Sequence, residues 1–358
     1  MKAFIISNPS AGNRLLSEEL RQVAGYLEGE GWAVTATKTT RGAGDATTYA
    51  REAAAEGYDV VLVSGGDGTI AETIDGLVGT DTALAILPSG TGNVMARQLN
   101  LPIPGALQTG VLLQAARLNL SGQIRPVDVG RMSFPLSNIP ARHFICWAGV
   151  GFDAEFNQQF NRDRNLKRRL GPGAMAVAMF YTLRDFAGTG AVVRLDGKIV
   201  SRRLLMLSAS NIQIYGIIFK MAPAAVLDDG LLDIVCFQGS RPIRMLAHLG
   251  EMLFSQHVRD PKVDRFQARR VEVTTTRPLP VHVDGDCIGE TPVVINVLPR
   301  ALKLVVPSSA SSGLFAQDSR DEADQPGLTA SLQRNTVERV RRIARDAQDA
   351  IKERRYHP

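Results

Sequence analysis

Glycine and aspartate gather in one short segment, residues 64–69, with the sequence Ser-Gly-Gly-Asp-Gly-Thr. An apolar run at residues 60–63 precedes it, and a helical pattern at residues 70–77 follows it. Open parallel sheets bind ligands beyond the carboxyl ends of their strands, so we expect a ligand at this turn. Glycine lets backbone N–H groups approach phosphate oxygens, and Asp67 could reach a magnesium ion or its waters. The alternative is a tight strand–helix turn in which Asp67 only caps the helix.

Two similar turns follow other predicted strands, at residues 8–12 (Asn-Pro-Ser-Ala-Gly) and 87–93 (Leu-Pro-Ser-Gly-Thr-Gly-Asn). In the second turn, Thr91 and Asn93 could bond phosphate oxygens or base edges. Three glycine-rich turns at three strand ends are harder to explain by chance than any one of them. The chain has no G-x-x-x-x-G-K-[ST] P-loop and no G-x-G-x-x-G after its first strand. Walker-type and Rossmann sites are therefore disfavoured.

The elements that must position these turns alternate between strand and helix. Apolar periodicity predicts strands at residues 2–7, 32–37, 59–64 and 83–87, and helices at residues 17–28, 44–56 and 70–77. Continuously apolar strands separated by helices indicate a parallel sheet that is covered on both faces. We therefore predict an α/β first domain with a doubly wound parallel sheet.

The pattern changes after about residue 127. Short strands are predicted at residues 144–148, 191–195, 204–208, 232–237, 270–275, 280–283 and 293–297, with one helical insertion at residues 173–186. This series predicts a C-terminal β-sandwich domain. The expected domains are residues 1–127, residues 128–300, a final strand at 301–307 that could return to the first domain, and a linker with an amphipathic tail helix at 308–358.

Composition bounds the class of protein. A chain of 358 residues exceeds what one hydrophobic core usually supports, and 44% hydrophobic with 22% charged residues is typical of a globular protein. The net charge of +5 is mild, and we expect no nucleic-acid partner. The three cysteines lie far apart without a CxxC pair, which favours a reduced compartment. No apolar run reaches the roughly 20 residues of a membrane span, and no signal peptide is evident, so we predict a cytoplasmic location.

These motifs, in this order and spacing, resemble the diacylglycerol kinase-like lipid kinase family, which also contains sphingosine and ceramide kinases. The resemblance runs from residue 2 to about residue 307. It rests on the turn at 8–12, Thr40 with Gly44-Asp45-Ala46, and the segments 65–69, 88–93, 126–130 (Pro-Val-Asp-Val-Gly), 149–155 (Gly-Val-Gly-Phe-Asp-Ala-Glu), 228–233 (Asp-Asp-Gly-Leu-Leu-Asp) and 283–286 (Val-Asp-Gly-Asp). It implies transfer of a phosphoryl group from ATP to a lipid hydroxyl, in a cleft between a nucleotide domain and a β-sandwich.

The resemblance also implies roles for individual residues. ATP would lie over Asn8, Thr40, Gly65, Gly66, Asp67, Gly68, Thr69, Gly90, Thr91 and Asn93. Asp67, Asp128 and Asp284 would hold a catalytic Mg²⁺ through water. The family's general base is usually a glutamate two residues after the aspartate of an Asp-Gly-Glu turn, and this position is Asp286 here, which is shorter by one methylene.

A second, structural Mg²⁺ is implied at the Asp-Asp-Gly-Leu-Leu-Asp loop. Its ligands would be Asp229 and the backbone carbonyls of Val226 and Leu231. A plain polar turn is the alternative there. The basic residues 162–169 and the apolar helix after them could rest on anionic headgroups, which predicts peripheral association with the inner membrane face; a solvated loop beside a packed helix would look the same. A homo-oligomer is left open.

Two competing functions remain at this point. NAD kinases carry a similar Gly-Gly-Asp-Gly-Thr turn, although they lack the combination of segments 149–155 and 228–233 seen here. A regulator that binds nucleotide but turns over weakly is the other alternative, and Asp286 in place of glutamate is the one feature in its favour.

Overall fold

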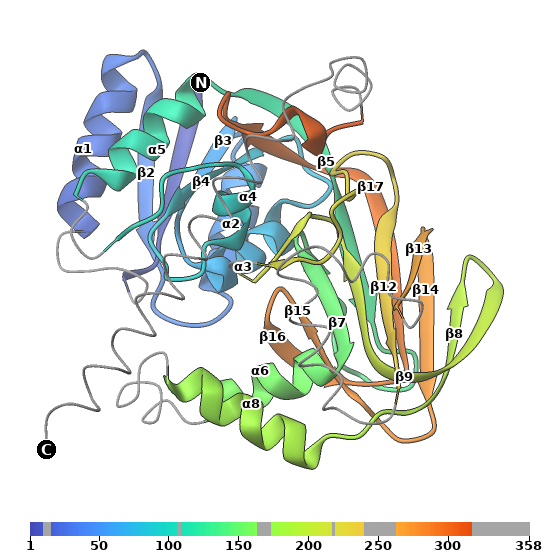
Figure 1. Ribbon diagram of the computed structural model, residues 1–358. Coiled ribbons are helices and arrows are strands. Elements are labelled where there is room, and N and C mark those ends of the chain that lie inside the picture. Colours follow the sequence, from blue (N-terminus) through green and yellow to red (C-terminus); the bar gives the residue numbers. More distant parts are fainter. Residues whose placement is uncertain (10–15, 106–108, 163–172, 217–218, 240–262, 317–358) are drawn as a thin grey trace, which may run out of the picture. The chain divides into compact units, whose positions relative to one another are not determined.

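The computed structural model describes residues 1–9, 16–105, 109–162, 173–216, 219–239 and 263–316, and most of its strands join one continuous sheet (Figure 1). The path through this sheet runs β16-β15-β7-β9-β8-β14-β17-β4-β3-β1-β2. Residues 1–315 form one compact unit. No helix within the described part of the chain is long and apolar enough to cross a bilayer.

The first part of the chain supplies the parallel half of the sheet. Its strands are β1 (Lys2–Ser7), β2 (Ala33–Thr39), β3 (Val60–Gly65) and β4 (Ala83–Pro88). All residues of β3 and β4 are buried, as expected of central strands in a sheet covered on both sides. Each strand pairs with its neighbour in parallel.

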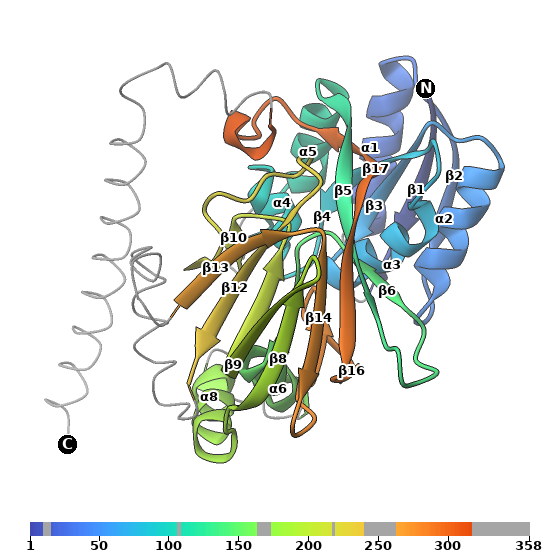
Figure 2. The ribbon, with the colours of Figure 1, turned by 90° about the vertical axis from the view of Figure 1, so that its right-hand side faces the viewer.

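Parallel strands need crossover connections, and helices provide them. The helices are α1 (Leu16–Gly29), α2 (Asp45–Ala55), α3 (Asp67–Leu77), α4 (Val94–Gln98) and α5 (Val111–Leu120). The sheet order β4-β3-β1-β2 with right-handed crossovers puts α1 on one face and α2 and α3 on the other. Helix α5 packs beside α1, and α2 beside α3 (Figure 2). The predicted doubly wound α/β fold is confirmed.

The second part of the chain is antiparallel and β-rich. Its strands are β6 (Arg142–Phe144), β7 (Trp147–Gly151), β8 (Thr189–Leu195), β9 (Lys198–Ser210), β10 (Ile214–Tyr215), β11 (Phe219–Lys220), β12 (Leu232–Gln238), β13 (Val263–Ala268), β14 (Arg270–Thr275), β15 (Pro280–Val283) and β16 (Asp286–Glu290). Burial alternates along β8, which is the pattern of a strand with one face on a core. Helices α6 (Phe152–Arg162) and α8 (Gly173–Asp185) lie at one end of these strands (Figure 1). The predicted β-sandwich class is confirmed.

Two long strands tie the halves together. β5 (Gln123–Ser133) pairs with β17 (Val293–Val306) in antiparallel register from Val294↔Ser133 to Val306↔Gln123. The start of β17 also pairs with β14, whereas Lys303 and Leu304 pair in parallel with β4. A register shift between Leu298 and Leu302 separates these two parts. The domain limits predicted near residues 127 and 300 therefore fall inside continuous strands, and the division stays a prediction.

Buried side chains form two hydrophobic clusters. One surrounds the parallel strands and includes Phe4, Leu62 and Ile86. The other fills the β-rich half and includes Phe144, Leu207 and Phe237. Residues 145–147 belong to the first cluster, although the next strand, β7, contributes to the second. The connection before β7 is therefore where the two cores meet.

Three differences from the sequence-based elements matter for the site. The strand predicted at residues 144–148 is wrong, because β6 ends at Phe144 and β7 begins at Trp147. The helix predicted from residue 70 begins at Asp67. α5, β5 and α6 were not predicted as elements. The predicted tail helix and most of the basic stretch 162–169 lie outside the described residues.

Candidate active site

The carboxyl ends of β1–β4 are joined to one another by backbone hydrogen bonds. The Asn8 N–H donates to the Ser64 carbonyl at 2.8 Å, and the Thr40 N–H donates to the Ser7 carbonyl at 2.8 Å. The Asn8 amide nitrogen also donates to the Thr69 hydroxyl at 2.8 Å. The predicted ligand-binding residues Asn8, Thr40 and Thr69 are thus brought to one edge of the sheet.

The glycine turns after β3 and β4 touch backbone to backbone. A Cβ built on Gly90 would overlap the Cα of Gly66, and one on Gly92 would overlap a carboxylate oxygen of Asp67. A Cβ on Gly65 would overlap the Thr69 side chain. Glycine is therefore required by close approach here, and the two turns form one surface lined by main-chain atoms.

Asn93 has a different task from the ligand contact predicted for it. It is fully buried and adopts a left-handed conformation with φ of 50°. Its side-chain oxygen accepts the Gly90 N–H at 3.1 Å, and its amide nitrogen donates to the Gly90 carbonyl. Asn93 therefore shapes the turn from inside, whereas Thr91 is exposed beside it.

Two buried hydroxyls lie at the same strand ends. The Oγ atoms of Ser64 and Ser89 have no hydrogen-bond partner among the described residues. A buried polar group without a partner costs about 1–3 kcal/mol. Together with the turns in which a Cβ would collide, these hydroxyls suit a site whose remaining hydrogen bonds come from a bound oxyanion such as a nucleotide phosphate.

Asp67 is the first residue of α3 and faces the turn after β4. Its carboxylate accepts the Val94 N–H at 2.7 Å. No side chain caps α3, whose N-cap is Gly66, so Asp67 does not serve as the N-cap. Burial raises the pKa of Asp67, although the Val94 N–H opposes this shift. A cation beside this carboxylate would relieve the cost of its burial.

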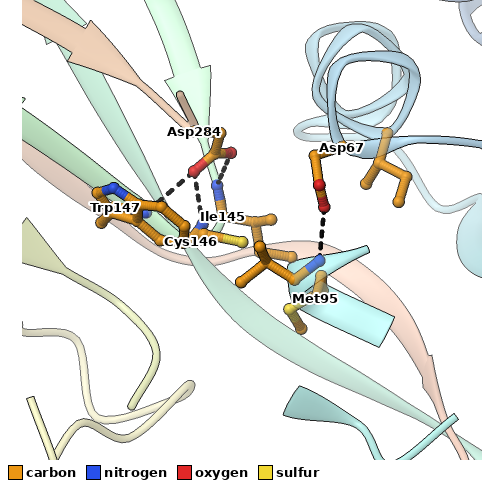
Figure 3. A pocket seen from close by; sticks show the side chains of 8 residues that line it. Asp67, Met95, Ile145, Cys146, Trp147 and Asp284 are labelled. Carbon is orange, nitrogen blue, oxygen red and sulfur yellow. Dashed lines mark hydrogen bonds between the residues drawn. The ribbon is translucent and has the colours of Figure 1, made fainter. Parts of the chain in front are cut away.

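Asp284 occupies the turn between β15 and β16. Asp284 and Gly285 both have positive φ, 46° and 91°, as the two central residues of a type I′ hairpin turn require. The Asp284 carboxylate accepts three backbone N–H groups, from Ile145 at 3.0 Å, Cys146 at 3.0 Å and Trp147 at 2.9 Å (Figure 3). These bonds explain the break between β6 and β7, because residues 145–147 turn their N–H groups to Asp284.

Asp67 and Asp284 line one pocket (Figure 3). Its other lining residues are Ile70, Val94, Met95, Ile145, Cys146 and Trp147. Burial, and then the negative charge of Asp67, raise the pKa of Asp284 to about 6 against the three N–H donors. The described residues contain no group of three or more His, Cys, Asp or Glu arranged to hold a metal. Two carboxylates nevertheless suit Mg²⁺, which keeps several waters and binds through one or two carboxylates plus substrate phosphates.

Asp286 approaches the same place from the β-rich half. It is the exposed first residue of β16, and its Oδ2 lies 4.0 Å from the position that a Cβ on Gly68 would occupy. The structure thus gathers Asp67, Asp284 and Asp286 around the N-terminus of α3. Asp284 and Asp286 come from the β15–β16 hairpin, which is far later in the chain than Asp67.

Asp128 is not part of this group. It is fully buried in β5, and its two oxygens accept the Gly230 N–H at 2.6 Å and the Arg300 N–H at 2.7 Å. Burial raises its pKa, and the nearby charges of Asp229 and Asp228 add to the shift. The structure therefore places Asp128 with the loop of the predicted structural Mg²⁺ and ties that loop to β17.

That loop concentrates negative charge. The Asp229 carboxylate accepts the Leu231 N–H at 2.9 Å, and burial followed by the charge of Asp228 raises its pKa. Burial is also the main cause that raises the pKa of Asp233 to about 6. The Asp229 arrangement is compatible both with a cation held by Asp229 and the carbonyls of Val226 and Leu231 and with a polar turn, so that site stays a prediction.

Sequence reasoning missed two residues behind the Asp284 turn. Asp153, in the first turn of α6, lies 2.9 Å from Nε2 of His282 on β15. Asp153 belongs to the motif at residues 149–155, but no role was attached to it. The available signal was an imidazole placed among apolar residues in a strand that ends at a site turn.

The comparisons with known proteins agree with this geometry. Residues 2–132 match the family of diacylglycerol kinase catalytic domains, and residues 147–306 match the YegS C-terminal NAD kinase beta sandwich-like domain. A protein named diacylglycerol kinase from Bacillus subtilis is 29% identical over 315 residues, covering 87% of this chain and 99% of that protein. One of the same name from Staphylococcus carnosus is 27% identical over 324 residues, covering 88% of this chain and 99% of its own.

A solved structure gives the same result. The crystal structure of a candidate diacylglycerol kinase from Bacillus anthracis aligns with a TM-score of 0.71 and 26% identity, covering 87% of this chain and 96% of that one. Both halves of the chain and the order in which they occur are thus shared with these proteins. By its fold and by the two adjoining domain matches, this chain belongs to the diacylglycerol kinase-like family of lipid kinases.

Proposed function

We propose that this protein transfers the γ-phosphoryl group of Mg-ATP to the hydroxyl of diacylglycerol or a related lipid. The observation that carries the proposal is the convergence of Asp67, Asp284 and Asp286 at the N-terminus of α3. Phosphoryl transfer depends on positioning, on neutralisation of charge by a metal, and on a base for the attacking hydroxyl. These three carboxylates and the adjoining glycine turns meet each of those needs.

The nucleotide would bind over the paired glycine turns. Main-chain N–H groups near Gly66 and Gly90 and the N-terminus of α3 favour phosphate oxygens, because both present positive partial charge. Thr69 and Asn8, already hydrogen-bonded to each other, flank this surface. Two hydrogen bonds from the Asn93 side chain to Gly90 fix the shape of this turn, so little ordering would be needed when the phosphates bind.

Asp67 and Asp284 would hold Mg²⁺, at least in part through water. A bound Mg²⁺ would neutralise charge that develops on the transferred group. The protein's own contribution is to hold both carboxylates in fixed positions by hydrogen bonds that oppose the rise in their pKa values. The Val94 N–H does so for Asp67, and the three N–H groups of residues 145–147 do so for Asp284.

Asp286 would act as the general base. Its carboxylate is exposed and lies beside Gly68, so it can reach a lipid hydroxyl at the edge of the phosphate site. In this step the hydroxyl proton moves to an Asp286 oxygen while the hydroxyl oxygen bonds to the γ-phosphorus. The bond from that phosphorus to the bridging oxygen breaks, and ADP leaves. A well-placed base contributes about 10²–10⁴-fold to rate.

A lipid acceptor implies that the enzyme works at a membrane surface. The relatives' names specify diacylglycerol, which supports this substrate class for the present chain. Phe180 and Tyr181 of α8 are exposed, with 61% and 43% of their surface accessible. Aromatic side chains of this kind favour a membrane interface. Peripheral association through α8 is therefore part of the proposal.

One experiment tests the chemistry. Purified protein is incubated with γ-labelled ATP, Mg²⁺ and mixed micelles of diacylglycerol, and the labelled lipid is extracted and counted. Asp67→Ala should abolish labelling. Asp286→Asn should lower turnover by about 10²–10⁴-fold with ATP binding near normal, and Asp286→Glu should keep substantial activity. Asp81→Asn is a matched surface control, because Asp81 only pairs with Lys303 at the exposed rim.

The same assay separates the alternatives. Labelling of NAD in place of lipid would favour the NAD kinase-like interpretation, which the sandwich-like domain match alone would allow. ATP binding with no acceptor labelled in a total lipid extract would favour a weakly active regulator. Full turnover by Asp286→Asn would remove Asp286 as the base, and full turnover by Asp67→Ala would remove the metal assignment.

A further inference from the structure

A buried polar network lies directly behind the turn that carries Asp284 and Asp286. His282 is fully buried and Asp153 is 6% exposed. His282 Nε2 lies 2.9 Å from Oδ2 of Asp153, and the Gly285 N–H is directed at His282 Nδ1 over 3.2 Å. Gly285 is the residue between the two site carboxylates. The imidazole therefore joins α6 to the centre of the site turn.

The hydrogen bonds determine which ring nitrogen carries the proton. A backbone N–H can only donate, so Nδ1 must be the acceptor for Gly285. Nε2 must then carry hydrogen and donate to Asp153, which is a neutral imidazole with one defined tautomer. A proton on Nδ1 would set two donors against each other and break the bond to Gly285.

The hydrogen bonds of Asp153 favour this tautomer of His282. Its Oδ1 accepts the Ala154 N–H at 2.8 Å, and its Oδ2 also accepts the Tyr215 hydroxyl at 2.8 Å. Asp153 lies in the first turn of α6, where the positive end of the helix dipole favours a carboxylate. Asp153 accepts from both of these donors, and it acts as an acceptor toward His282 Nε2 as well.

The surrounding backbone leaves room for this pair. A Cβ built on Gly149 of β7 would overlap both Oδ2 of Asp153 and Nε2 of His282. Tyr215 packs against Trp147 with ring centroids 4.8 Å apart, and Trp147 lines the pocket of Asp67 and Asp284. The network thus touches the site from two sides, through Gly285 and through Trp147.

We propose that Asp153 and His282 are positioning residues: Asp153 holds His282 in its Nε2–H tautomer, and His282 holds the Gly285 N–H so that Asp284 and Asp286 keep their places. This inference rests on the proposed function, in which Asp284 helps to bind the metal and Asp286 accepts the proton. The network itself does not contact the reacting atoms.

Two amide substitutions of His282 test its hydrogen bonds to Gly285 and to Asp153 separately. In His282→Asn, the side-chain oxygen falls near the place of Nδ1 and can accept from Gly285, but the side chain is too short to reach Asp153. In His282→Gln, the amide nitrogen can reach Asp153, but no acceptor faces Gly285. We expect His282→Gln to lower kcat by about 10- to 100-fold, as is typical when the partner of a site ligand is removed. His282→Asn should stay within about fivefold of wild type, since the bond to the turn survives.

Asp153→Asn tests the tautomer. An asparagine here presents an N–H either to His282 or to Ala154, so the arrangement of three donors cannot be kept. We expect kcat to fall as in His282→Gln, with the KM for ATP within about twofold of wild type, because the glycine turns are on other strands. In the His282→Asn background, Asp153→Asn should add little, since the shortened side chain at position 282 no longer reaches Asp153.

A substitution elsewhere in the β-rich half serves as the control for loss of stability. Thr189→Val removes the hydrogen bond between the hydroxyls of buried Thr189 and exposed Thr276, which are 2.7 Å apart and lie outside β15 and β16. If it lowers the urea midpoint as much as His282→Gln but keeps kcat, loss of stability does not explain the effect. Equal losses of kcat in His282→Asn and His282→Gln, or losses that follow stability alone, would overturn the proposal.

A readout without activity separates this inference from the proposed function. The Gly285 amide should exchange slowly in wild type and in His282→Asn, and at least about tenfold faster in His282→Gln and Asp153→Asn. Nitrogen NMR of the imidazole should show the Nε2–H tautomer in wild type. If these hold while Asp286→Asn keeps full turnover, the network stands and the base assignment fails. Unchanged Gly285 exchange in His282→Gln would refute the network whatever the activity.

Discussion

Replacement of Asp284 by asparagine should change how the free energy of unfolding depends on pH. Burial, reinforced by the charge of Asp67, raises the pKa of Asp284 from its ordinary 3.8 to about 6, although three backbone N–H groups oppose the shift. The metal-free folded protein therefore holds a proton on this carboxyl more tightly than the unfolded chain does. Asparagine carries no such proton, so the comparison isolates this one group.

The sign and size follow from linkage. Since the folded-state pKa is the higher one, the stabilising contribution of Asp284 is complete below pH 3.8 and is lost as the pH rises through about 6. The full difference corresponds to roughly 3 kcal/mol. About 2 kcal/mol of it falls between about pH 4.5 and about pH 7.5. The free energy of unfolding of Asp284→Asn minus that of wild type should rise by this amount over that interval.

Urea unfolding at closely spaced pH values, without divalent metal, measures this difference. Carboxyls other than Asp67, whose charge interacts with Asp284, titrate alike in both proteins and cancel. Asp81→Asn serves as a control: the Lys303 ammonium holds the pKa of exposed Asp81 below its usual 3.8, so its difference curve should stay nearly flat over this interval and slope the opposite way only at more acidic pH. Mg²⁺ at the alkaline end of the interval should stabilise wild type more than Asp284→Asn. A flat difference curve for Asp284→Asn would refute the account of a carboxyl destabilised by burial beside Asp67.

Two further substitutions test the surfaces around the site. Gly90→Ala forces a Cβ onto the Cα of Gly66, so it should lower stability by about 1–3 kcal/mol and weaken ATP binding measured by calorimetry, whereas Gly25→Ala in the open middle of α1 should stabilise by about 0.5–1 kcal/mol and leave binding unchanged. Asp128→Asn cannot accept both N–H groups now bound, so it should lower the urea unfolding free energy by about 1–3 kcal/mol; lost turnover with unchanged stability would instead return Asp128 to the catalytic metal.

Much of the first half could be predicted from the sequence. β3 and β4 are continuous apolar runs followed by glycine turns, so their buried position and the turns after them are local properties of those residues. The same holds for the Asp284-Gly285 turn, because an aspartate–glycine pair between short apolar strands favours a type I′ hairpin. The motifs could therefore be located, and the family resemblance recognised, before any tertiary contact was known.

The partners of these residues were decided only by the tertiary structure. The strand predicted at residues 144–148 breaks because three N–H groups turn to Asp284, which lies 137–139 positions later. Asp128 resembles the other site aspartates in its motif, yet the pairing of β5 with β17 buries it beside Gly230 and Arg300. Local sequence reports propensity and burial, but the pairing of distant strands sets which carboxylates meet.

The network behind the site shows the same division. Each member is ordinary in its local setting: an aspartate at a helix start and a histidine in a short strand. They meet across 129 positions of sequence because β7 and β15 pair at Gly149 and His282, and because Gly149 has no side chain to keep them apart. The sequence by itself determined which chemical groups this protein carries and the elements that hold most of them. Packing between the two cores decided which of those groups share a hydrogen bond or a pocket.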